Sequence, residues 1–145
     1  MTFIKRPYRV VSDARLLDAM ERVAVTGGML HPDCERSEAL DFLENNALAE
    51  GRANPIDHSS TCPPWIKEKA ISRAIELAGL VACPLYVVHL STAGGLARIV
   101  EAQARGQPVW TETCPQYLLL DDGEFEELGP FAKPPPVRMA GTTSS

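Results

Sequence analysis

The chain has 145 residues, of which 45% are hydrophobic and 23% are charged, and its formal net charge is -5 at pH 7. This length suits one domain with a buried core, and the composition is that of a globular protein. The acidic balance argues against a surface for nucleic acid or anionic membrane. Neither a membrane span nor a signal peptide is expected, because the apolar runs are too short.

The four cysteines are scattered, without a Cys-x-x-Cys pair. This spacing disfavours a zinc knuckle and a disulfide framework. We therefore expect a cytoplasmic, reducing location, with the cysteines acting as small buried apolar side chains.

Helical and strand-like segments alternate along the chain. Helices are expected where apolar residues recur about every 3.6 residues, and several of these stretches end at glycine. The expected elements are a helix over 15–25 capped by Ser12, a strand end at 29–31, a helix over 37–50, a loop over 52–64, a helix over 65–80, a strand over 85–90, a helix over 92–105, a strand over 108–113 and a disordered tail over 139–145.

Strand–helix–strand units of this length predict a parallel α/β architecture. Residues 85–90 are apolar on both faces, as in a buried parallel strand. Gly94-Gly95, after this strand, gives a weak hint of an anion-binding turn.

Polar residues stand near the ends of two apolar segments. His89 is the last but one residue of the 85–90 strand, and His31 ends the segment before Pro32. Ligands bind beyond the carboxyl ends of parallel strands, and two neutral imidazoles there could share a metal ion. The alternative, which spacing alone favours, is a hydrogen-bonded core histidine.

Other residues with chemical potential give weaker signals. Glu112 could act as a base, although a solvated carboxylate is the usual case. Cys114 has no basic neighbour in the sequence, which argues against a nucleophile. His58 lies in the proline-rich loop, where a surface role is expected, and Trp65 and Trp110 are expected in the core.

Three segments resemble the dihydropyrimidinase/hydantoinase family of cyclic amidohydrolases. They are residues 41–56 with Pro63-Pro64, residues 86–91 and residues 112–118, and the stretch 135–138 also resembles the family. Related allantoinases tend to have histidine where Gln116 stands. The resemblance implies a partial (β/α)8 TIM-type barrel of the metal-dependent amidohydrolases, covering roughly the fifth to seventh strand units. We take 1–138 as this partial barrel domain.

The resemblance also implies metal ligands. It makes His89 a ligand at the end of the sixth barrel strand. For the fifth strand, matching Cys34-Glu35 without a gap places Asp33 at the ligand position, whereas a two-residue shift restores His31. Both alternatives stay open, and zinc is the metal implied, with two ions in complete family members.

The activity implied is hydrolysis of a ring C–N bond in a dihydropyrimidine or hydantoin by zinc-activated water. The first-strand His-x-His and the eighth-strand aspartate base of the family are missing, and Phe3 replaces a tyrosine that binds substrate. The chain therefore offers at most a metal half-site and no catalytic residue. We expect the isolated chain to be inactive, as a gene fragment, a truncated copy or a piece of a split barrel.

Two other interpretations remain at this point. One is a non-catalytic dihydropyrimidinase-like scaffold or assembly protein, and the other is an allantoinase-like amidohydrolase. The partners expected are a small cyclic amide substrate and either a homo-oligomer or a complementing barrel fragment. The homo-oligomer and the complementing fragment are expected because an open barrel leaves strand edges exposed.

Overall fold

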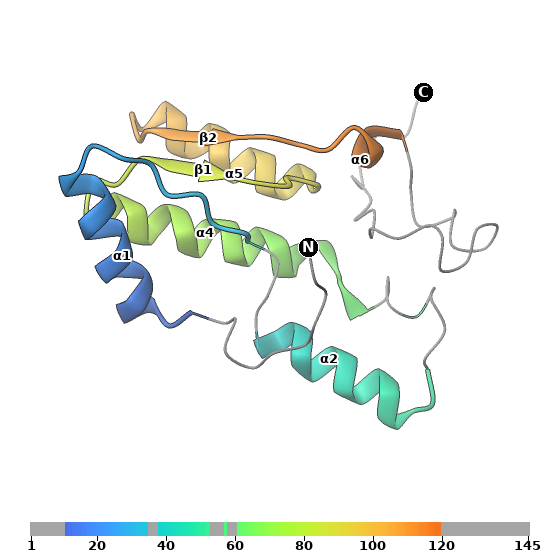
Figure 1. Cartoon of the computed structure of the whole chain (residues 1–145). Helices are drawn as coiled ribbons and strands as arrows, with labels where there is room; N and C mark the ends of the chain where they lie inside the picture. Colours follow the sequence, from blue (N-terminus) through green and yellow to red (C-terminus); the bar gives the residue numbers. More distant parts are fainter. Residues whose placement is uncertain (1–10, 35–37, 53–56, 58–60, 120–145) are drawn as a thin grey trace.

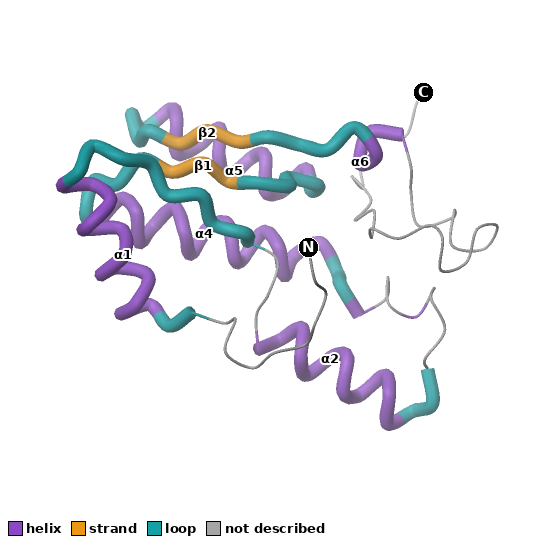
Figure 2. Tube along the Cα trace, viewed as in Figure 1, coloured by secondary structure: helices purple, strands orange, loops and turns teal. Residues whose placement is uncertain are grey.

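A computed structural model describes residues 11–34, 38–52, 57 and 61–119 of the chain (Figure 1). Helices and strands alternate along the second half, as Figure 2 shows by colour. The elements are α1 (Asp13–Val25), α2 (Glu38–Ala49), α4 (Pro64–Leu80), β1 (Leu85–Val87), α5 (Ala93–Ala104), β2 (Val109–Thr111) and α6 (Gln116–Leu119).

The sheet is parallel, as the sequence predicted. β1 pairs with β2 in the register Leu85 with Val109, and α5 makes the crossover between the two strands. On the other side of β1, Leu30 forms an isolated parallel bridge with Leu85. The Tyr86 amide donates to the Leu30 carbonyl over 2.8 Å, so the segment before α2 lies beside β1. Three chain segments therefore run in the same direction.

One face of the sheet is covered by helices. Leu85 and Val87 are fully buried and Val109 is 2% exposed, whereas Trp110 is 46% exposed. This alternation arises because successive side chains of a strand point to opposite faces. The buried face packs with the inner sides of α4 and α5 and with Met20 of α1. The other face is open among the described residues.

The close approach of α4 and α5 depends on the glycine pair. A Cβ at Gly95 would lie 2.7 Å from Cδ1 of Ile71, and a Cβ at Gly94 would collide with the Glu68 carboxylate. The space beside this turn is thus filled by the protein's own side chains. Gly94-Gly95 serves helix packing, and the hint of an external anion site is not supported.

Helix ends follow the sequence closely. The Ser12 hydroxyl accepts from the Arg15 amide at the start of α1, and Gly27 follows its C-terminus at φ +69. Gly106 has φ +80 after α5. Glycine adopts such a left-handed conformation without the steric cost of a Cβ. α1 ends at Val25 as predicted, and α5 ends at Ala104, one residue before its predicted end.

Several boundaries and burial states differ from expectation. β1 ends at Val87 and β2 spans only Val109–Thr111, and the short α6 was not predicted. The prediction that both tryptophans lie in the core is wrong, since Trp65 is 48% exposed and Trp110 is 46% exposed. The expected tail, Phe3 and His58 lie outside the described residues. Within the described part, no helix is long and apolar enough to cross a membrane.

The core assignment gives a stability prediction. Ile75 is 2% exposed on α4, and Val25 is 88% exposed at the end of α1. Ile75→Ala should lower the free energy of unfolding by about 2–5 kcal/mol, because it removes buried methyl groups and leaves a cavity. Val25→Ala, as the matched control, should change it by less than about 0.5 kcal/mol. Urea unfolding of both variants measures this, and equal effects would contradict the assigned core.

Candidate functional site

The carboxyl ends of β1 and β2 bring a histidine, a carboxylate and a thiol together. The Nδ1 atom of His89 lies 3.4 Å from Sγ of Cys114 and 3.8 Å from Oε1 of Glu112. His89 comes from the segment after β1, and the other two come from the segment after β2. This is the edge of a parallel sheet at which ligands bind.

Backbone hydrogen bonds continue beyond both strands and align these segments. The Glu112 amide donates to the Val87 carbonyl, and the Leu90 amide donates to the Glu112 carbonyl over 2.9 Å. The Thr113 hydroxyl then donates to the Leu90 carbonyl over 2.6 Å. The two segments are therefore held side by side where the regular strands have ended.

His89 itself has an unusual backbone. Its φ is +57, in the left-handed region, and it lies in a turn two residues past the end of β1. The prediction that His89 belongs to the strand itself is therefore wrong. A non-glycine residue in that conformation costs on the order of 1–2 kcal/mol. The turn places the imidazole, whose side chain is 22% exposed, against Cys114 and Glu112.

The thiol of Cys114 has a basic neighbour in space that the sequence did not reveal. A thiol beside an imidazole is an arrangement used both for nucleophiles and for metal ligands. Cys34 and Cys83 are buried, as predicted, and burial raises the pKa of the Cys83 thiol, with an opposing contribution from a backbone hydrogen bond at Leu30. Cys62 and Cys114 are only partly buried, unlike the expectation, and the four cysteines form no disulfide with one another.

His31 and Asp33, the alternative ligands, are both exposed. The His31 ring stacks on Tyr86 with centroids 4.9 Å apart, which engages its aromatic face. Counting forward from the bridge between Leu30 and Leu85 puts His31 level with Tyr86, and Asp33 one residue short of the level of His89.

The described residues do not make a complete metal centre. His89, Glu112 and Cys114 have donor types that suit zinc. However, no group of three or more His, Cys, Asp or Glu residues in the described part could hold a metal ion. The donor types of these residues suit part of a metal site, but the described residues do not form a complete one.

Lys67 is a buried residue near this cluster that the sequence analysis missed. It is 6% exposed, and its Nζ donates to the His89 carbonyl over 2.7 Å and to the Ser91 hydroxyl over 2.9 Å. The signal was present, because residue 67 shares the helical face of Ile71 and Ala74. The burial of Ser91, which is 0% exposed, argues against a Ser–Lys hydrolase pair.

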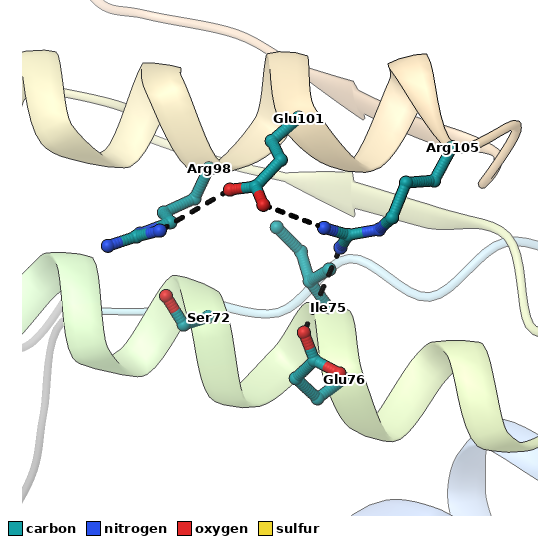
Figure 3. A pocket seen from close by; sticks show the side chains of 6 residues that line it. All are labelled: Ser72, Ile75, Glu76, Arg98, Glu101 and Arg105. Atoms are coloured by element: carbon teal, nitrogen blue, oxygen red, sulfur yellow. Dashed lines mark hydrogen bonds and ion pairs between the residues drawn. The ribbon is translucent and has the colours of Figure 1, made fainter.

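A separate hollow of about 290 Å³ lies between α4 and α5 (Figure 3). Its lining carries charges that neutralise one another. Glu101 pairs with Arg105 at 3.0 Å and with Arg98 at 3.3 Å, and Arg105 also reaches Glu76 at 3.8 Å. This network joins the two helices on their exposed side and presents no unpaired charge that would select a ligand.

The parallel α/β unit, with polar side chains gathered beyond the carboxyl ends of its strands, has the arrangement of the class of α/β proteins that bind ligands at that edge. Within that class, the chain is 36% identical over 130 residues to a D-hydantoinase of Geobacillus stearothermophilus, covering 87% of this chain and 28% of the relative. It is 32% identical over 136 residues to an allantoinase of Escherichia coli O9:H4 (strain HS), covering 93% and 30%.

Solved structures agree. A dihydropyrimidinase from Brevibacillus agri NCHU1002 matches with a TM-score of 0.85 and 37% identity, over 93% of this chain and 30% of that one. An L-hydantoinase from Arthrobacter aurescens matches with a TM-score of 0.86 and 30% identity, over 94% and 31%. No family model matches.

The chain is similar, over most of its own length, to members of the dihydropyrimidinase/hydantoinase family of cyclic amidohydrolases. It spans about 30% of the length of the curated relatives it matches. The resemblance seen in the sequence is thus confirmed.

The left-handed turn gives a prediction that separates glycine from alanine. At position 89, glycine should give a protein more stable than alanine by about 1 kcal/mol, because only alanine adds a Cβ at φ +57. The same pair at His31, which is not among the residues with positive φ, should show the opposite order. Thermal and urea unfolding of the four variants measure this, and alanine above glycine at position 89 would contradict the turn.

Proposed function

We propose that this chain is part of a metal-dependent hydrolase that opens the ring of hydantoins or dihydropyrimidines at a C–N bond. Two observations together carry the proposal. The chain matches a dihydropyrimidinase with 37% identity and a TM-score of 0.85, and its own His89 lies beyond the carboxyl end of a parallel strand.

In the proposed complete protein, the described elements form three neighbouring units of a (β/α)8 barrel. The Leu30 segment, β1 and β2 would be the fifth, sixth and seventh strands, in agreement with their parallel order. Residues 1–138 would make up this part of the barrel, followed by the tail 139–145. The open face of the sheet, with Tyr86 and Trp110, would then point to the barrel interior.

His89 is proposed as a metal ligand through Nε2. Its Nδ1 faces Glu112 and Cys114, and a ligating histidine usually directs its second ring nitrogen to such a partner. For the second ligand we favour Asp33 over His31, because His31 stacks on Tyr86 and Asp33 comes closer to the level of His89. Zinc is the proposed metal, and when bound it would lower the pKa of a coordinated water.

Glu112 and Cys114 would orient the imidazole in this site. A carboxylate at 3.8 Å from Nδ1 can accept the ring proton after a small rotation, which fixes the tautomer that leaves Nε2 free for the metal. Neither residue is proposed to touch the substrate.

A second candidate is an allantoinase-like activity, which the 32% identity to an allantoinase favours. Gln116, where related allantoinases tend to have histidine, argues for a hydantoinase. A scaffold that keeps the barrel without catalysis is the third. The half-open sheet also supports a partner, either a second copy of the chain or the complementing part of the barrel.

The ligand proposal predicts how zinc binding responds to mutation. Competition with a chromophoric chelator should show zinc binding by the chain that is lost in His89→Ala and in Asp33→Ala, because each removes a ligand. His31→Ala should bind zinc as the wild type does. Loss of zinc in His31→Ala with retention in Asp33→Ala would reverse the ligand choice, and zinc retained in His89→Ala would refute the site.

The activity proposal needs the rest of the barrel. The isolated chain should not hydrolyse hydantoin, dihydrouracil or allantoin, because its described residues form no complete metal centre. Residues 8–138 inserted in place of the matching segment of the Geobacillus D-hydantoinase should restore hydrolysis of hydantoin or dihydrouracil, and His89→Ala should abolish it.

Faster turnover of allantoin than of hydantoin by this chimera would favour the allantoinase alternative. A folded, zinc-loaded chimera that hydrolyses none of the three would contradict an enzymatic role and favour the scaffold.

A further inference from the structure

Lys67 is a charged side chain placed where the chain otherwise buries apolar groups. It extends from the first half of α4 toward the turn after β1 and is 6% exposed. We propose that Lys67 is a positioning residue that locks the turn carrying His89 and so fixes the direction of the imidazole. Its importance for metal binding rests on the proposed function, whereas its hold on the turn does not.

The contacts of Lys67 fall on both sides of Leu90. Its ammonium donates to the His89 carbonyl over 2.7 Å and to the Ser91 hydroxyl over 2.9 Å. An ammonium group has several donors that diverge from one atom, so one side chain can hold two acceptors two residues apart. Hydrogen bonds that involve a charged group are stronger than neutral ones.

The carbonyl that Lys67 holds belongs to the strained residue. His89 has φ +57, a conformation that a non-glycine residue keeps only where its surroundings enforce it. On the opposite side, the Leu90 amide donates to the Glu112 carbonyl, and Thr113 donates to the Leu90 carbonyl. The turn is thus held from α4 on one side and from the segment after β2 on the other.

The aromatic ring of Tyr117 adds to the site of the ammonium. Nζ of Lys67 lies 5.7 Å from the centroid of that ring, within the range of a cation–π interaction. Tyr117 belongs to α6, which begins two residues after Cys114 along the chain. One lysine therefore links three elements around His89, from α4 through the turn after β1 to α6.

The test compares Lys67→Met with Lys69→Met. Methionine keeps an unbranched side chain and removes the charge, and Lys69 is an exposed lysine on the same helix. In Lys67→Met the Leu90 amide should exchange with solvent about tenfold faster, and the ring nitrogen resonances of His89 should shift. In Lys69→Met both should match the wild type. Unchanged Leu90 exchange and His89 resonances in a folded Lys67→Met protein would overturn the proposal.

A measurement on the wild-type chain keeps the test valid if Lys67→Met does not fold. The ammonium protons of Lys67 should exchange slowly enough to give a separate nitrogen-correlated NMR signal, because they are buried and hydrogen-bonded, whereas those of Lys69 should not. Exchange as fast as that of Lys69 would overturn the proposal.

Zinc titration then separates this proposal from the function. If the chain binds zinc, Lys67→Met should weaken the affinity about tenfold, as for other residues that orient a ligand. Unchanged affinity beside a disturbed His89 ring would refute the link to the metal. Absence of zinc binding in the wild type would count against the proposed function alone, since the NMR results still decide the role of Lys67 in the turn.

Discussion

The parallel pairing of β1 with β2 is the constraint on which the rest of this structure depends. Parallel neighbours require a crossover, so α5 must cross one face of the sheet, and α4 packs beside it there. Their carboxyl ends then meet at one edge. Because the pairing continues through the bond from the Leu90 amide to the Glu112 carbonyl, polar residues beyond the strands come together instead of diverging into solvent.

The same pairing accounts for the backbone strain at this edge of the sheet. His89 leaves the strand direction through a left-handed turn, and that turn exists because neighbours on both sides hold its backbone. A strained residue held by several hydrogen bonds at the ligand edge of a sheet is typical of functional sites. In this chain, the turn directs an imidazole at a carboxylate and a thiol, although the described part of the chain supplies no complete metal centre.

Local sequence signals predicted the elements well and the burial of single residues less well. The Ser12 cap and the glycines after α1 and α5 lie where expected, because capping depends on a few neighbouring residues. The strands are shorter than their apolar runs, since strand ends depend on the partner strand. Trp110 was expected in the core but is 46% exposed. Which face of a strand is buried depends on the elements that pack against it, and the local sequence does not specify them.

By itself, the sequence determined the parallel α/β class, most helix limits and the resemblance to the family, and it singled out His89 as a candidate, because periodicity, caps and short motifs are written in neighbouring residues. Tertiary structure alone decided that Cys114 and Glu112 face His89, and that Lys67 is a core residue holding the same turn. Those contacts join residues 22 to 25 positions apart. They arise only when strand register and helix crossover bring distant segments to one edge, which no local pattern specifies.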